Sequence, residues 1–66
     1  MNQTLIANRL KAYRGNMTQK EVADAVGVTA MAISQYEKGE RIPRDDVKVK
    51  IAKLFNKTVD EIFFAE

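Results

Sequence analysis

The apolar residues of this chain recur at intervals of three and four positions, which is the spacing of amphipathic helices. In the first segment Ile6, Leu10 and Tyr13 keep this spacing, with polar residues between them. Thr4 is the expected cap at the start of this helix. Three segments with helical spacing end in a glycine, because the left-handed backbone of a helix C-terminus favours a residue without a side chain. These glycines are Gly15, Gly27 and Gly39.

The second and third of these segments also have recognisable starting points. Thr18 and Glu21 have the spacing of a capping box, in which the hydroxyl and the carboxylate each accept a backbone N–H of the first turn. The apolar face of the helix that follows is formed by Val22, Ala23 and Val26. Thr29 is the expected cap of the third helix, whose buried side is marked by Ile33 and Tyr36. The pattern therefore predicts a helix, a tight turn and a second short helix.

The second half of the chain begins with Pro43, Asp45 and Asp46, which suit a helix start because acidic groups favour the positive end of the helix dipole. The next five residues alternate as a strand would, but a lone strand would have nothing to pair with. The longer window favours a helix with one apolar face, formed by Val47, Ile51, Leu54 and Phe55. Val49 does not fit this face.

A last helix is indicated near the end of the chain. Asn56 can adopt the left-handed conformation that ends the fourth helix, and Thr58 with Glu61 has the spacing of a second capping box. The inward residues of this helix would be Val59, Ile62 and Phe63. The predicted fold class is therefore all-α, with five short helices.

Composition restricts the possible functions. The chain has 66 residues, enough for one domain around one modest core. It contains neither cysteine nor histidine, so we expect no disulfide, metal or other cofactor. No apolar run approaches the roughly 20 residues of a membrane span, and the N-terminus does not resemble a signal peptide, so we expect a cytoplasmic protein. The net charge of +2 is too small to indicate a nucleic-acid partner by itself.

Residues 19–38 have the steric pattern of two helices packed at a steep angle. Ala23 permits a close approach of the second helix to the third, and Gly27 permits the sharp turn between them. Four apolar positions would hold the pair together, namely Val22, Val28, Ile33 and Tyr36. This is the pattern of a helix-turn-helix, in which one side of the second helix projects from the domain.

From Thr18 to Gly39, and onward through Pro43 to Phe63, the chain resembles the phage Cro and repressor family of helix-turn-helix proteins. The resemblance implies a lambda-repressor-like domain over residues 1–66, with the motif at about residues 19–38 as its second and third helices. It implies a transcriptional regulator, and specifically a repressor, that binds a two-fold symmetric double-stranded DNA operator as a homodimer. The source would be a bacterium or a phage, and the place of action the nucleoid.

Two features of this chain differ from the usual family pattern. The loop between Arg14 and Thr18 is shorter than is common in the family. The family often pairs an arginine near the end of the first helix with a glutamate that matches Glu37, and Arg14 is the best candidate for that arginine here. The alternative is an unpaired arginine at the surface, since exposed ion pairs often contribute little.

The third helix supplies the candidate residues for reading DNA bases. With Ile33 and Tyr36 inward, the outward residues nearest the start of this helix are Ala30, Met31, Ser34 and Gln35. A glutamine can form two hydrogen bonds with adenine, and apolar side chains can contact thymine methyl groups. We therefore expect recognition of sequences rich in A·T pairs. Two alternatives stay open: Met31 as an ordinary core residue, and Gln35 as a solvated helix residue.

Phosphate contacts are expected around this helix. Gln19 lies at the start of the second helix, where a backbone N–H and the helix dipole favour an anion. The other candidates are Thr29, Lys38, Arg41 and Arg44. The remaining lysines are interpreted as a solvated helix face without a role in DNA binding. They are Lys48, Lys50, Lys53 and Lys57.

Two other classes of function were weighed. An enzyme is not expected, because the only dense groups of titratable residues are two acidic pairs at helix starts, where capping explains them. A protein-interaction module, such as an antitoxin, could use Phe63 and Phe64 as an apolar edge. Because two adjacent aromatic residues cannot share one helix face, Phe64 is a candidate for contact with a second subunit.

Overall fold

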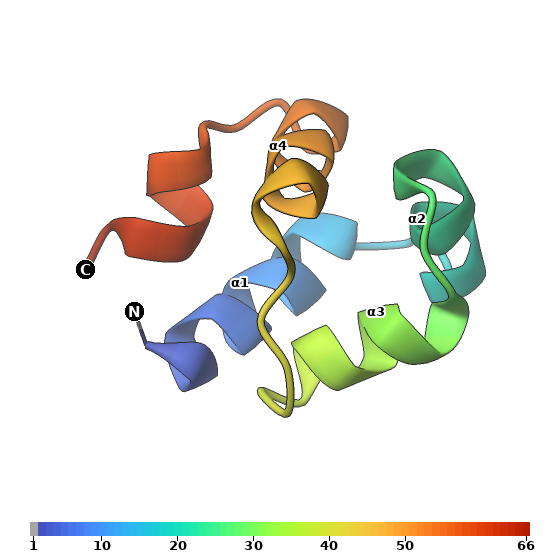
Figure 1. Cartoon of the computed structure of the whole chain (residues 1–66), viewed down its shortest axis with the longest axis horizontal. Helices are drawn as coiled ribbons and strands as arrows, with labels where there is room; N and C mark the ends of the chain where they lie inside the picture. Colours follow the sequence, from blue (N-terminus) through green and yellow to red (C-terminus); the bar gives the residue numbers. More distant parts are fainter. Residues whose placement is uncertain (1) are drawn as a thin grey trace.

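The computed structural model describes residues 2–66 and contains five helical segments and, within these residues, no strand. The helices are α1 (Gln3–Arg14), α2 (Gln19–Val26), α3 (Ala30–Glu37), α4 (Asp45–Leu54) and η1 (Asp60–Phe64). They surround one core, in which α3 packs against α1 and α2, α4 packs against α2, and η1 packs against α1 (Figure 1). Within residues 2–66, none of the helices is both long enough and apolar enough to cross a membrane. The predicted all-α class with five short helices is confirmed.

The first helix begins earlier than the sequence pattern indicated. Asn2, and not Thr4, caps α1, because its side-chain oxygen accepts the N–H of Leu5 at 3.0 Å. Asparagine is at least as good a cap as threonine, and the apolar spacing alone did not separate the two positions. In the middle of α1, Arg9 Nη1 donates to the Ile62 carbonyl oxygen at 3.1 Å, which connects α1 to η1.

The expected helix-turn-helix is formed by α2 and α3. The capping box at Thr18 and Glu21 is complete, with hydrogen bonds of 2.8 and 3.0 Å. Gly27 ends α2 with a φ of 77°, a conformation that residues with a side chain rarely adopt. Its N–H and that of Val28 both donate to the Ala23 carbonyl oxygen, so the chain turns within two residues and reaches Thr29.

The C-terminal segment differs from an ordinary helix in its winding. Thr58 and Glu61 form the expected capping box, and the hydrogen bonds from Thr58 lower the pKa of the Glu61 carboxyl. The segment then continues as a π-helix, in which the N–H of Ala65 donates to the Asp60 carbonyl oxygen at 2.7 Å. Both Ile62 and Phe63 are fully buried, as the apolar pattern predicted.

One lysine in α4 is not where the sequence interpretation placed it. The prediction that Lys48 lies on a solvated face is wrong, because only 6% of the residue is exposed. Its Nζ lies 3.4 Å from an Asp45 carboxylate oxygen and less than 6 Å from the ring centres of Phe63 and Phe64. The charge patterning of α4 could not show this contact, because η1 lies over this face of α4 only in the folded chain.

Candidate nucleic-acid interface

The first turn of α3 projects from the domain while its later residues anchor it. Thr29 caps the helix through its hydroxyl oxygen, which accepts the N–H of Ala32 at 3.1 Å. Ile33 and Tyr36 are each 3% exposed and pack into the core. Met31, in contrast, is 70% exposed, so it is not a core residue. The leading turn of α3 can therefore enter a groove without disturbing the core.

The four candidate base-reading residues lie on the outer side of α3, but they are not equally exposed. Ala30 and Met31 are exposed, whereas Ser34 and Gln35 are half-buried. The Gln35 carbonyl oxygen accepts the N–H of Glu40 at 3.0 Å, which connects the end of α3 to the following loop. The helix therefore presents an apolar tip at its start and an amide side chain further along.

A buried ion pair holds α3 against the end of α1. Arg14 and Glu37, the pair expected from the sequence, are joined by hydrogen bonds of 2.6 and 3.1 Å, and Glu37 is 4% exposed. The hydrogen bond to Glu37 raises the pKa of the Arg14 guanidinium. Arg14 also donates to the Met17 carbonyl oxygen at 2.8 Å, which orders the short loop before α2. One arginine thus connects α1, this loop and α3.

Gln19 has a partner that the sequence did not reveal. Its side-chain nitrogen donates to Glu37 at 3.1 Å, so this side chain belongs to the same cluster as Arg14. A glutamine amide carries two N–H groups, and one of them is used here. The other N–H group of this amide is not used in the cluster.

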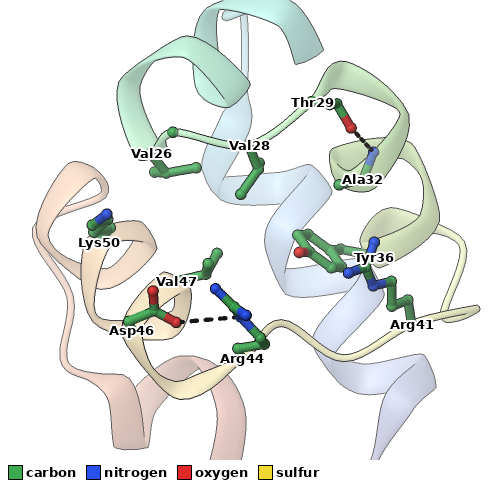
Figure 2. Close-up of a pocket in the computed structure, with 11 residues that line it drawn as sticks. Val26, Val28, Thr29, Ala32, Tyr36, Arg41, Arg44, Asp46, Val47 and Lys50 are labelled. Carbon is green, nitrogen blue, oxygen red and sulfur yellow. Dashed lines mark hydrogen bonds and ion pairs between the residues drawn. The ribbon is translucent and has the colours of Figure 1, made fainter.

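The remaining cationic phosphate candidates lie at the end of α3 and in the loop that follows it. Lys38, at the end of α3, is exposed, and so are Arg41 and Arg44. The Arg41 guanidinium lies 5.8 Å from the centre of the Tyr36 ring. Arg44 lies 3.7 Å from Asp46, and both of these side chains are largely exposed. The structure brings Thr29, Arg41 and Arg44 around one cavity, which Gln19 and Lys38 do not line (Figure 2).

Phe64 lies on a different part of the surface, in η1. It is 52% exposed, whereas its neighbour Phe63 is 1% exposed, so the two rings face in different directions. The Lys48 ammonium group lies 5.3 Å from the centre of the Phe64 ring. Phe64 is therefore an exposed aromatic residue next to a buried cation.

Comparison with known proteins gives consistent results. A family model described as helix-turn-helix matches residues 10–62. An uncharacterized helix-turn-helix-type transcriptional regulator of Methanocaldococcus jannaschii is 39% identical over 61 residues, which cover 89% of this chain and 92% of that protein. The cryptic phage CTXphi transcriptional repressor RstR of Vibrio cholerae is 37% identical over 57 residues, covering 86% of this chain and 49% of the repressor.

Two solved structures of one phage repressor are also similar. The P22 c2 repressor in complex with a synthetic operator superposes with a TM-score of 0.89 at 26% identity, covering 94% of this chain and 97% of that one. The DNA-binding domain of the same repressor in solution gives a TM-score of 0.83 at 30% identity, with 94% and 84% coverage.

Proposed function

Because this chain belongs to the helix-turn-helix family of the phage-repressor type, we propose that it is a transcriptional regulator that binds double-stranded DNA in a sequence-specific manner. The observation that carries the proposal is the exposed leading turn of α3 beyond its buried anchors, Ile33 and Tyr36. A helix held in this way fits the major groove of DNA. The chain acts as one domain over residues 1–66, on the DNA of the cytoplasmic nucleoid.

The proposed mode of regulation is repression. The relatives whose names state a role include the CTXphi repressor and the P22 c2 repressor, and the latter was solved on an operator. A small domain seated in the major groove blocks the access of other proteins to the same DNA. Phosphate contacts on either side of α3 supply affinity, and the exposed residues of α3 supply the choice of sequence.

Gln35 is the residue proposed to read a base directly. Replacing it with alanine is expected to weaken binding to the cognate site by about 1 to 3 kcal/mol, because the two hydrogen bonds to an adenine are lost. Binding to DNA of random sequence is expected to change little. Both affinities are measured by fluorescence anisotropy at one salt concentration. Equal losses on the two DNAs would contradict a base-reading role for Gln35.

We also propose that two copies of the chain bind one operator, with Phe64 in the contact between them. Two-fold symmetry would place the two α3 helices about 34 to 36 Å apart, one turn of the DNA helix. Sedimentation at micromolar concentration is expected to show two protomers on each operator duplex. Phe64→Asp is expected to lower the number of protomers on each duplex toward one. Val49→Asp, at an exposed apolar residue of α4, is expected to leave this number unchanged. A strict monomer with and without operator would contradict the dimer.

A further inference from the structure

A cavity of about 290 Å³ lies beside α3, between the α2–α3 turn, the loop after α3 and the first turns of α4 (Figure 2). Its inner wall is largely apolar and is formed by Val26, Val28, Ala32 and Val47. Its outer wall carries exposed basic side chains, which are Arg41, Arg44 and Lys50. This volume is close to the lower limit of about 300 Å³ for pockets that bind small molecules.

The charges around the cavity favour an anion. Three cationic side chains and one carboxylate, that of Asp46, line it, which leaves an excess of two positive charges. Asp46 lies 3.7 Å from Arg44, a long and exposed pair of the kind that contributes little. Lys50 makes no ion pair within residues 2–66. Its Nζ lies close to Gly27, at 4.0 Å from the position that a Cβ atom would take on this glycine. A phosphomonoester carries about −1.5 to −2 charge and so matches this excess, whereas a phosphodiester of the DNA backbone carries one negative charge and matches half of it.

The cavity is also lined by a hydroxyl group that can donate a hydrogen bond, that of Tyr36. Tyr36 is 97% buried, yet its hydroxyl makes no hydrogen bond among the side chains of residues 2–66. Figure 2 shows this hydroxyl directed into the cavity, across from Arg44 and Val47. Within residues 2–66 no buried side-chain nitrogen or oxygen lacks a partner, so this hydroxyl is open to the cavity rather than sealed in the core. An anionic oxygen in the cavity would accept this hydrogen.

The wall formed by α4 adds further donors. Arg44 precedes α4 without capping it through its side chain, so the first backbone N–H groups of this ten-residue helix have no side-chain partner. Asp46 and Val47, in its first turn, line the cavity. The positive end of the helix dipole therefore lies at the cavity wall, where Asp45 and Asp46 of the same turn offset part of it.

We propose that this cavity binds a phosphate ester, with Lys50 and Arg44 as its ionic contacts and the Tyr36 hydroxyl as a hydrogen-bond donor. The ester is either a free phosphomonoester or a phosphodiester of the DNA backbone. A free ester would compete with DNA, because Arg41, Arg44 and Thr29 are also proposed to contact the backbone. That consequence rests on the proposed function, whereas binding of the free ester does not.

The first arm of the test uses phenyl phosphate, without DNA, followed through the backbone amide signals of Gly27, Thr29 and Val47 in ¹H–¹⁵N NMR spectra. Saturable shifts confined to these residues are expected. Lys50→Gln is expected to weaken the apparent affinity about tenfold, the loss of one charged hydrogen bond. Lys53→Gln is the matched control, because Lys53 is exposed on the same helix and does not line the cavity. Tyr36→Phe, which keeps the ring, is expected to weaken binding as well.

The second arm measures binding of a random-sequence DNA duplex by the same two lysine variants. If Lys50→Gln weakens duplex binding more than Lys53→Gln does, the DNA backbone is a source of the phosphate. If only phenyl phosphate binding depends on Lys50, the ligand is a free ester. The proposal is overturned if neither arm separates the two variants, or if phenyl phosphate shifts signals evenly over the surface. Because the first arm contains no DNA, its failure is distinct from a failure of DNA recognition.

Discussion

Replacing Arg14 with alanine is expected to lower the free energy of unfolding by about 3 kcal/mol. The change leaves the Glu37 carboxylate buried, with only the Gln19 amide as a side-chain partner. An uncompensated buried charge is strongly destabilising. In a domain of this size, 3 kcal/mol corresponds to a fall in Tm of roughly 12 to 24 °C. Thermal unfolding followed by circular dichroism measures it.

The control for this prediction is an ion pair of similar length on the surface. Lys20 and Asp24 lie 3.0 Å apart on α2, with both side chains largely exposed. Lys20→Ala is expected to change the unfolding free energy by less than about 0.5 kcal/mol, because water screens such a pair. Replacing Arg14 and Glu37 together by apolar residues is expected to recover part of the loss. A loss at Arg14 as small as that at Lys20 would contradict the role given to this pair.

DNA binding is expected to weaken about 10³-fold when the salt concentration rises from 50 to 200 mM. Three of the proposed phosphate contacts, Lys38, Arg41 and Arg44, are cationic, which gives about six in a homodimer. Each neutralised phosphate contributes about −0.9 to the slope of log K against log salt, because counterions are released from the duplex. The slope is measured by fluorescence anisotropy at several salt concentrations.

Single variants distinguish contacts to phosphates, which change the salt dependence, from contacts to bases, which do not. Arg41→Gln is expected to make the slope less steep by nearly two units, since each subunit of the homodimer loses one cation. Gln35→Ala is expected to leave the slope unchanged, since it removes a contact to a base. A slope near zero for the unmodified protein would contradict the proposed phosphate contacts.

The helix-turn-helix could be predicted from local signals, because each of its boundaries is fixed by adjacent residues. Thr18, Gly27 and Thr29 act through their own backbone conformation or through hydrogen bonds to residues at most four positions away. The start of α1 was misplaced because Asn2 and Thr4 are both suitable caps. The π-helical winding of the last segment was not predicted, since its capping box and its apolar residues fit an ordinary helix equally well.

Contacts between distant segments were harder to foresee. Nothing local marks Lys48 as buried, because the rings that cover it come from η1. The hydrogen bond from Gln19 to Glu37 joins residues 18 positions apart, and the sequence indicated only that Gln19 begins a helix. Lys50 is exposed, as predicted. The cavity that it lines could not be predicted, because this cavity forms only where α4 packs beside the α2–α3 turn. These features arise from tertiary packing.

The central claim, that α3 reads DNA sequence from the major groove, is tested most directly by selecting bound sequences from a pool of random DNA. We predict an enriched motif of two inverted half-sites, centred about 10 to 10.5 base pairs apart and rich in A·T pairs. Selection with the Gln35→Ala variant is predicted to lose the preference at one position in each half-site. A pool that stays random after repeated selection, or a motif that Gln35→Ala leaves unchanged, would contradict the claim.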